Sequence, residues 1–208
     1  LWRVADPAWI AAVQTLMADR PLLIADGHHR YETALRMGQP RTLMTFVSLQ
    51  SPGLRCFATH RIVHSLKDFQ PEAFLAKLPA VAPGLDPLVS PPGNIRFGIL
   101  METGEYHCDV PAPEGSLNVA VLQDSILTPL LGITPAVVTA GTNLRYKRTR
   151  EEALAEVKEG RAQITFLLED LPIDGMARVS FGGQVLPQKS TYFYPKLGSG
   201  LVMLELQP

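Results

Sequence analysis

Cysteine is scarce in this sequence, with Cys56 and Cys108 the two examples among 208 residues. Small secreted proteins that depend on disulfide bonds usually carry more cysteines in a shorter chain. Both residues lie in apolar, strand-like stretches, which is typical of buried and unreactive thiols. We therefore expect a protein of the reducing cytoplasm.

The sequence also lacks an excess of one charge. Nineteen Lys and Arg residues face 20 Asp and Glu residues, which gives a formal net charge of −1. Proteins that bind nucleic acid usually carry a basic surface. The balance therefore disfavours nucleic acid as a partner and leaves a small molecule as the expected ligand, with the oligomeric state open.

Long hydrophobic runs are missing as well. The most apolar stretch, residues 117–140, is interrupted by Gln123, Asp124 and two prolines. A membrane-spanning helix needs about 20 consecutive apolar residues. We therefore expect a soluble protein without a membrane partner.

Motifs typical of zinc sites and of nucleotide-binding P-loops are also absent, because the sequence contains no HExxH, no paired CxxC and no GxxxxGK. Two of its five histidines, His60 and His64, would share one face of a strand. Two histidines without further ligands are a weak indication of a metal site. A polar cluster at the end of a strand explains them equally well.

Hydrophobic residues make up 46% of the chain and charged residues 19%. A chain of this composition buries enough apolar surface to fold, which excludes general disorder. We expect one compact α/β region over residues 1–208, with a sub-division near residues 83–94, where Pro and Gly are frequent. The first residue is Leu1 rather than Met, which indicates a piece of a longer protein.

Hydrophobic periodicity and capping residues predict helices that alternate with strands. The expected helices span residues 7–19, 28–37, 71–78, 118–131, 150–159 and 172–179. The expected strands span residues 22–25, 42–49, 54–63, 95–101, 105–110, 163–168 and 201–206. Because two of them flank Thr103-Gly104 as a β-hairpin, we predict an α/β or α+β fold with a mixed sheet, interleaved helices and at least one hairpin.

The segment Asp26-Gly27-His28-His29-Arg30 joins an expected buried strand to an expected helix. The first N–H groups of a helix have no partner within the helix, and the helix dipole is positive there. Such a turn suits a phosphate or another anion, and the His and Arg side chains add hydrogen-bond donors. Asp26 could orient a histidine or hold a magnesium ion.

A purely structural role for the same segment is the alternative. In that case Asp26 caps the helix and the histidines bind nearby carbonyl groups. Spacing leaves both interpretations open, since glycine-containing turns before helices are common. The run of His28, His29 and Arg30 on one helical turn favours a binding site.

A second unusual segment spans residues 187–200. It combines Lys189 and Lys196 with the pair Ser190-Thr191 and three aromatic residues. A cation beside two small hydroxyl donors is the chemistry of a phosphate cradle. The alternative is a rigid loop between prolines whose aromatic side chains cover the core.

Four cations, Arg145, Lys147, Arg148 and Arg150, lie within six residues. We interpret them as the solvent-exposed start of a helix, where Glu151 and Glu152 offset their charge. A contact with phosphate is the alternative.

Residues 24–35 and 187–196, followed by Gly200-Leu201-Val202, resemble an uncharacterised prokaryotic family that carries domain of unknown function 1015. Residues 59–63 and 121–132 also resemble that family, so the likeness covers nearly the whole chain. One departure is Leu186, where the family tends to have Met. Family members are roughly twice as long, so the resemblance implies that an N-terminal half is missing here, and it implies no established activity.

Over about a dozen residues, Gly27-His28-His29-Arg30-Tyr31 is similar to the signature of sulfiredoxin. The superfamily of that enzyme includes chromosome-partitioning CTPases and a free-serine kinase, in which the strand–turn–helix holds nucleotide phosphates. The likeness implies that His29 and Arg30 are phosphate ligands. His28 stands where sulfiredoxin has its reactive cysteine, which excludes sulfiredoxin chemistry.

We predict a kinase-like enzyme that binds a nucleotide or a phosphometabolite and transfers a phosphoryl group, and the serine kinase suggests a role in serine metabolism. The expected ligands are ATP, ADP or CTP with Mg²⁺. The candidate binding residues are Gly27, His29, Arg30, Lys189, Ser190, Thr191 and Lys196. The candidate catalytic residues are Asp26, which is also the candidate metal ligand, His28 and Glu32.

This interpretation requires the two motifs to meet in space, with Lys189 and Ser190 closing over the turn at residues 27–30. Two other functions are kept as alternatives. One is a nucleotide-sensing module without turnover. The other is a nucleic-acid-binding protein like the partitioning proteins, which the net charge disfavours.

Overall fold

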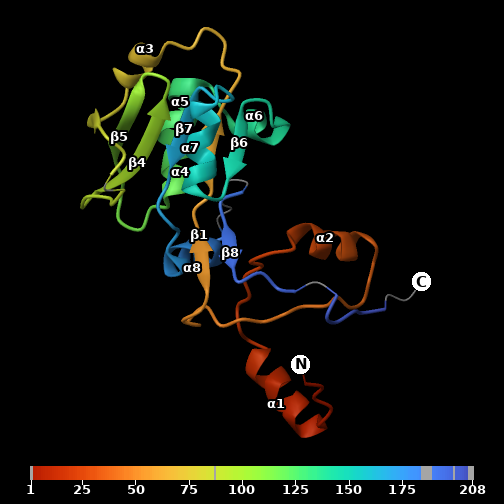
Figure 1. The fold of residues 1–208 in the computed structure, drawn as a ribbon. Coiled ribbons are helices and arrows are strands. Elements are labelled where there is room, and N and C mark those ends of the chain that lie inside the picture. The colour runs from red at the N-terminus through yellow and green to blue at the C-terminus, as the bar shows by residue number, and fades with distance from the viewer. Residues whose placement is uncertain (1, 87, 184–188, 199, 206–208) are drawn as a thin grey trace.

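The computed structural model describes residues 2–86, 88–183, 189–198 and 200–205, and its largest part is a six-stranded antiparallel sheet (Figure 1). The strand order is β3-β5-β4-β7-β2-β6, and every neighbouring pair is antiparallel. The strands are β2 (His60–Val63), β3 (Val81–Pro83), β4 (Asn94–Met101), β5 (Gly104–Pro111), β6 (Leu144–Lys147) and β7 (Ile164–Leu167). The expected α/β fold with interleaved helices and a hairpin is thus confirmed, whereas the sheet, expected to be mixed, is antiparallel throughout its described strands.

The hairpin of β4 and β5 forms where the sequence predicts it. Met101 pairs with Gly104 at the turn, and Gly104 has a φ of 141°, a conformation that favours glycine. The expected strand over residues 54–63 is interrupted at Ala58, whose amide donates to Asp170 Oδ1 at 2.8 Å. Its first part becomes β1 (Arg55–Phe57), which leaves the large sheet and pairs with β8 (Tyr192–Tyr194).

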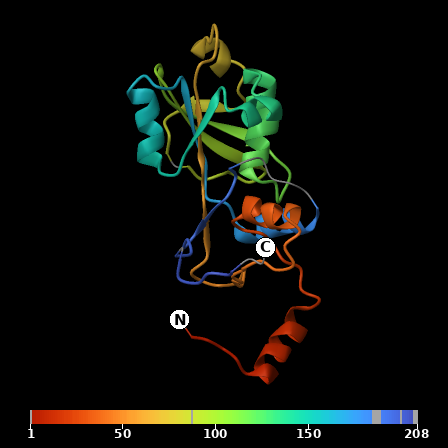
Figure 2. The same ribbon diagram turned by 90° about the vertical axis from the view of Figure 1, so that its right-hand side faces the viewer.

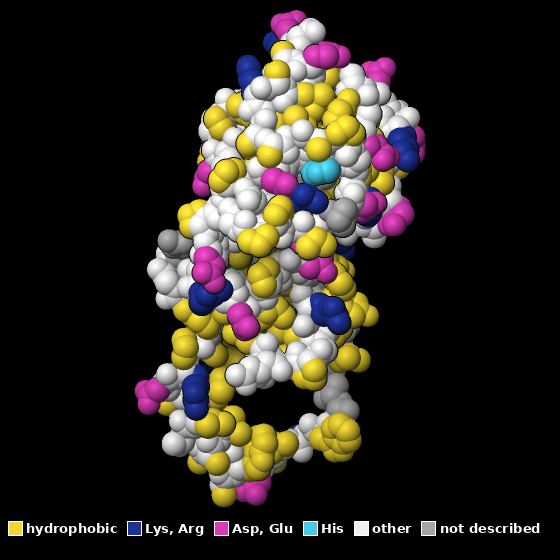
Figure 3. Space-filling model, turned by 90° about the vertical axis from the view of Figure 1, so that its left-hand side faces the viewer, with side chains coloured by type: hydrophobic (Ala, Val, Ile, Leu, Met, Phe, Trp, Pro, Cys, Tyr) yellow, Lys and Arg dark blue, Asp and Glu magenta, His cyan; other side chains and the backbone are white. Residues whose placement is uncertain are grey.

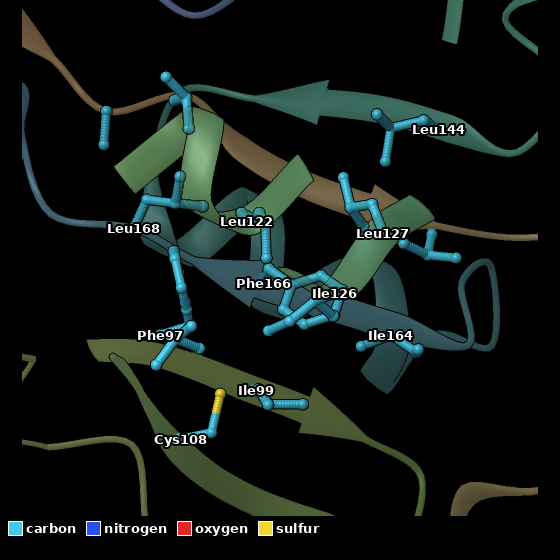
Figure 4. Close-up of a cluster of buried hydrophobic side chains, with 14 of the residues drawn as sticks. Phe97, Ile99, Cys108, Leu122, Ile126, Leu127, Leu144, Ile164, Phe166 and Leu168 are labelled. Atoms are coloured by element: carbon cyan, nitrogen blue, oxygen red, sulfur yellow. The ribbon is translucent and has the colours of Figure 1, made fainter. Parts of the chain in front are cut away.

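Helices cover both faces of the sheet (Figure 2). On one face, α7 (Arg150–Lys158) buries Ala153 against Ile62 and Leu167. On the other face lie α4 (Asn118–Leu122), the π-helical turn η1 (Gln123–Leu127) and α5 (Thr128–Leu131). Their apolar side chains pack on Phe97, Ile99 and Phe166 in the main core (Figure 4).

A smaller layer lies between the sheet and the N-terminal helix (Figure 1). It contains the β1–β8 pair, α8 (Ile173–Phe181) and α2 (His28–Arg36). The helix α1 (Pro7–Met17) lies apart from the rest of the chain (Figure 1). Two short helices complete the described elements, α3 (Pro71–Leu75) and α6 (Pro135–Ala140).

The helix predictions rest on local caps, and the structure confirms them. The Asp6 side chain accepts from the Ala8 amide at 2.9 Å at the start of α1, and Thr149 accepts from the Glu152 amide at the start of α7. The apolar side chains of α1 are nevertheless exposed, with Trp9 at 56% and Leu16 at 62%. In the view of Figure 3, hydrophobic side chains cover much of the lower part of the molecule. Most of the exposed large hydrophobic residues belong to residues 2–47 and 197–204.

Three strand predictions are wrong for the described residues. Residues 22–25 and 42–49 form no strand, nor do residues 201–205 of the third prediction, while its last residue, Leu206, lies outside the described part. In the first run Leu23 and Ala25 pack against the core, but Leu22 and Ile24 are exposed. An apolar run becomes a strand only when another strand takes its backbone hydrogen bonds, and no described strand lies beside these three runs.

Only Arg150 of the four cations begins a helix, and the described ion pairs of the cluster are made with Glu156 and Asp86 rather than with Glu151 and Glu152. Arg145 and Lys147 lie on β6, and each forms an ion pair of 3.2 Å with Glu156, a buried carboxylate of α7. Arg150 instead pairs with Asp86 at 2.8 Å. Glu156 lies in the second half of α7, beyond the loop that follows β6. Sequence spacing therefore does not predict its ion pairs with Arg145 and Lys147.

Within the described residues, no helix has both the length and the apolar character needed to span a membrane.

Candidate functional site

The start of α2 is built on a glycine in the left-handed conformation. Gly27 has φ 87° and ψ 24°, and a Cβ atom there would lie 2.9 Å from Nη2 of Arg30. The guanidinium of Arg30 therefore folds back over the turn, in space that only glycine leaves open. No described side chain caps the helix, so the amides of its first turn keep their capacity to donate to a ligand.

Asp26 does not act as the helix cap that the structural alternative requires. Its Oδ1 accepts from the amide of Gly27 at 2.8 Å, before the helix begins. Its Oδ2 accepts from Nζ of Lys196 at 3.0 Å. The hydrogen bond from Lys196 lowers the pKa of Asp26, and the positive charges of Lys196 and Arg30 lower it further. Asp26 thus stays ionised and holds the lysine beside the turn.

The Asp26–Lys196 ion pair joins two segments that are 170 positions apart. The sequence interpretation requires the two motifs to meet in space. Lys196, the last residue of the C-terminal segment (Lys189–Lys196), makes this contact. Lys189 is exposed, and among the described residues no ion pair joins its ammonium group to the turn. Ser190 is buried and Thr191 half-buried. The first two residues of the motif, Pro187 and Gln188, lie outside the described part.

Replacing either partner of the Asp26–Lys196 pair is expected to lower stability only slightly, because both side chains are partly exposed. We expect Asp26→Asn and Lys196→Met to show a coupling free energy of about 0.2–1 kcal/mol in a double-mutant cycle of urea unfolding. Lys189→Met is the matched control and should change stability by less than about 0.5 kcal/mol. Additive effects of the two replacements would show that the pair does not hold the segments together.

Glu32 and His29 lie on the exposed surface of α2. The Glu32 carboxylate is 3.3 Å from Nη2 of Arg36 and 3.8 Å from Nδ1 of His29. The side chain of His29 is fully exposed, and His28, the first residue of the helix, is exposed as well. Glu32 is therefore engaged by its own helix, one turn beyond the uncapped amides.

Two further residues complete the surroundings of Lys196. The Lys196 ammonium lies 5.0 Å from the centre of the Tyr192 ring, and the guanidinium carbon of Arg148 lies 4.3 Å from the same centre. Both distances are typical of cation–π contacts. From the sequence, Arg148 was an alternative phosphate contact and Tyr192 one of three aromatic residues of the C-terminal segment, and no spacing rule links Arg148 to that segment.

The described residues offer little for a metal ion. They contain no group of three or more His, Cys, Asp or Glu side chains that could hold one. Both oxygens of Asp26, the candidate magnesium ligand, already accept hydrogen bonds from Gly27 and Lys196. The donors present do not form a magnesium site of the kind expected.

Comparison with known proteins places the chain in a family. The sequence model of a family described as "Protein of unknown function (DUF1015)" matches residues 1–130. The chain belongs to this family. The match includes the turn at Asp26–Arg30, and it ends before the C-terminal segment (Lys189–Lys196) of this family member.

The fold of this DUF1015 protein is similar to that of solved structures. A conserved hypothetical protein from Pyrococcus furiosus matches 81% of this chain and 68% of its own, with a TM-score of 0.52 and 16% identity. A free serine kinase in complex with AMP matches 92% of this chain and 81% of its own, with a TM-score of 0.53 and 15% identity. A mutant free serine kinase in complex with ADP gives the same coverage and TM-score at 16% identity.

At these identities the likeness shows a shared fold. The kinase structures that share this fold are complexes with AMP or ADP. No curated protein sequence matches this DUF1015 protein. The family named from sequence motifs is thus confirmed, and the likeness to a free serine kinase is confirmed for the fold.

Proposed function

We propose that this chain binds a nucleotide at the start of α2 and transfers a phosphoryl group, as a kinase-like enzyme of small-molecule metabolism. The observation that carries the proposal is the helix start at Gly27, which no described side chain caps. The Arg30 guanidinium is folded against this turn, and Asp26 holds Lys196 beside it. The fold is shared with proteins described as free serine kinases in complex with AMP or ADP, which supports an adenine nucleotide as the ligand.

The proposed roles follow from charge and position. Phosphoryl transfer depends mainly on positioning and on stabilising the charge of the phosphate oxygens. The amides of the first turn of α2 and the Arg30 guanidinium would donate to one phosphate. Lys196, held by Asp26 in the free protein, would exchange that partner for a phosphate oxygen.

For proton transfer we propose His28 rather than Glu32. His28 stands at the first position of α2, beside the amides that would hold the phosphate. Glu32 is already engaged by His29 and Arg36. Asp26 is a weak base, because the hydrogen bond from Lys196 lowers its pKa, and it would position Lys196 instead.

A thermal-shift titration with ATP, ADP and CTP tests nucleotide binding. A ligand at about 100 times its Kd stabilises a protein by about 2.7 kcal/mol, which corresponds to roughly 5–10 °C for a chain of this size. We expect such a shift for wild type and for Arg36→Ala, and a clearly smaller one for Arg30→Ala. Absence of a shift with all three nucleotides would contradict the proposal.

An assay for the phosphorylated product separates an enzyme from a sensor. We propose L-serine as the first acceptor to test, because the similar structures are serine kinases by name. Transfer of phosphate from ATP or ADP to the acceptor would support turnover. Nucleotide binding without product for any small hydroxyl acceptor would favour the nucleotide-sensing module instead.

A further inference from the structure

Arg61 is a buried cation, and among the described residues it has no carboxylate partner. Its side chain is 3% exposed and lies on β2, in the sheet. Its Nη1 donates to the backbone carbonyls of Thr59 and of Lys189, the latter at 3.3 Å. In the part of the chain that the structure describes, no Asp or Glu side chain pairs with it. Burial lowers the pKa of Arg61 to about 10, which reflects the cost of a guanidinium in a poorly solvated place.

The remaining donors of Arg61 are unused. Nε and Nη2 of Arg61 donate to no described group. The described polar atoms that are fully enclosed and have no partner belong to other residues, His64, Asn118 and Glu156. A buried charge is normally balanced by an opposite charge or by a full set of hydrogen bonds. Arg61 has neither, so its free edge is suited to an anionic group from outside the chain.

A second cation, Arg148, lies two residues beyond the register partner of Arg61 and is exposed. The Arg61 guanidinium carbon lies 4.8 Å from the centre of the Tyr146 ring, and the two residues are register partners on β2 and β6. Arg148 follows Tyr146 by two residues and contacts Tyr192. In the described residues Arg148 forms no ion pair either. Arg61 and Arg148 thus each lie over a tyrosine ring, and neither has a carboxylate partner among the described residues.

Contacts of Tyr192 and Lys196 link these residues to the start of α2. Tyr192 also contacts Lys196, which pairs with Asp26. The C-terminal segment (Lys189–Lys196) thus contacts Arg61 through the Lys189 carbonyl and the α2 turn through the Lys196 ammonium. An anion at Arg61 would lie near Lys189, at one end of the C-terminal segment, and the proposed phosphate site lies near Lys196, at the other end.

We propose that Arg61 and Arg148 form a second anion site, which binds the carboxylate of the acceptor substrate. The site is inferred from the two unpaired guanidinium groups, and it rests on the proposed function only for calling its ligand an acceptor. A carboxylate fits better than a phosphate for two reasons. Its two oxygens match the paired Nε and Nη2 donors of a guanidinium, and a monoanion loses less hydration energy than a dianion when it is buried.

NMR titration of the full chain tests the site directly, through the resonances of the arginine Nε–H groups. The probes are L-serine, glycolate, ethylene glycol and inorganic phosphate, each with and without ADP. We expect L-serine and glycolate to shift the Arg61 Nε–H resonance, while ethylene glycol, which has hydroxyl groups but no charge, leaves it unchanged. Arg148→Ala should weaken glycolate binding about tenfold, as expected for the loss of a charge-assisted hydrogen bond.

Control variants distinguish a binding role from a structural one. Arg145→Ala removes an exposed cation of β6 that pairs with Glu156, and glycolate binding should stay within about twofold of wild type. Arg61→Lys keeps the charge but loses the paired donors, so it should weaken glycolate more than it weakens ADP. If it fails to fold, Arg148→Ala still decides the question.

The outcomes separate this proposal from the proposed function. No Arg61 shift with either carboxylate, or equal glycolate affinity in wild type and Arg148→Ala, overturns the carboxylate site. A shift with phosphate alone overturns it too, because the site would then belong to a phosphate. If glycolate binds in an Arg148-dependent manner but no nucleotide binds, the carboxylate site stands and the kinase proposal fails.

Discussion

Gly27→Ala is expected to weaken nucleotide binding about tenfold or more. The new Cβ would lie 2.9 Å from the Arg30 Nη2 atom, so the guanidinium must leave the turn on which it rests. Loss of one charge-assisted hydrogen bond to phosphate costs about 1.5–3 kcal/mol, or roughly one to two orders of magnitude in Kd. The left-handed backbone adds a stability cost of about 1–2 kcal/mol for a residue with a Cβ. ADP affinity by calorimetry and urea unfolding measure the two effects separately.

Gly38→Ala is the matched control, because Gly38 follows the other end of α2. It also has a positive φ, 64°, but a Cβ there would meet no atom within 4 Å. Both variants should therefore lose similar stability, while Gly38→Ala keeps the nucleotide affinity of wild type. Equal affinities in the two variants would show that the position of Arg30 over Gly27 has no part in binding.

Acidification from pH 7.5 to pH 4.5 should remove about 2–3 kcal/mol of stability through His60. Burial lowers the pKa of His60 to about 4, and its Nδ1 accepts from the Leu168 amide at 3.3 Å. In the unfolded chain the pKa of histidine is about 6.5. As the pH falls from about 6.5 to about 4, the unfolded state binds a proton that the folded state does not, so the free energy of unfolding decreases over that range.

His60→Asn isolates this effect, because an amide oxygen can accept from Leu168 but does not titrate in this range. Urea unfolding at pH 7.5 and pH 4.5 should show a pH dependence that is smaller by about 2–3 kcal/mol in His60→Asn than in wild type. The carboxylates with a lowered pKa, such as Asp109 beside Arg96, are common to both proteins. An equal pH dependence in the two proteins would show that His60 is not buried in its neutral form.

Local signals predicted much of the fold. The helices α1 and α7 begin at caps that can be read from Asp6 and Thr149, and the β4–β5 hairpin turns at Thr103-Gly104. These features depend on residues within a few positions of one another. The runs at residues 22–25 and 42–49 do not form strands, because a strand also depends on a neighbouring strand that hydrophobicity does not reveal.

The candidate site was predicted in part. Residues 26–30 were recognised because a strand-like run, a glycine and a helix start follow one another directly in the sequence. The contact of Lys196 with Asp26 and the position of Arg61 beneath Lys189 depend on how β1 and β8 pair. Nothing local distinguishes Lys196, which contacts the turn, from Lys189, which does not. Likewise Arg61 looks like any cation of a strand until the fold encloses it without a carboxylate.

The central claim is that the start of α2 binds the phosphates of a nucleotide, and calorimetric titration with ADP tests it most directly. Three proteins are compared: wild type, Arg30→Ala and Arg36→Ala, which remove the first and the last arginine of the same helix. We predict that Arg30→Ala raises the Kd of ADP about tenfold or more, whereas Arg36→Ala changes it by less than about twofold. ADP that fails to bind wild type, or that binds all three proteins with the same Kd, would contradict the claim.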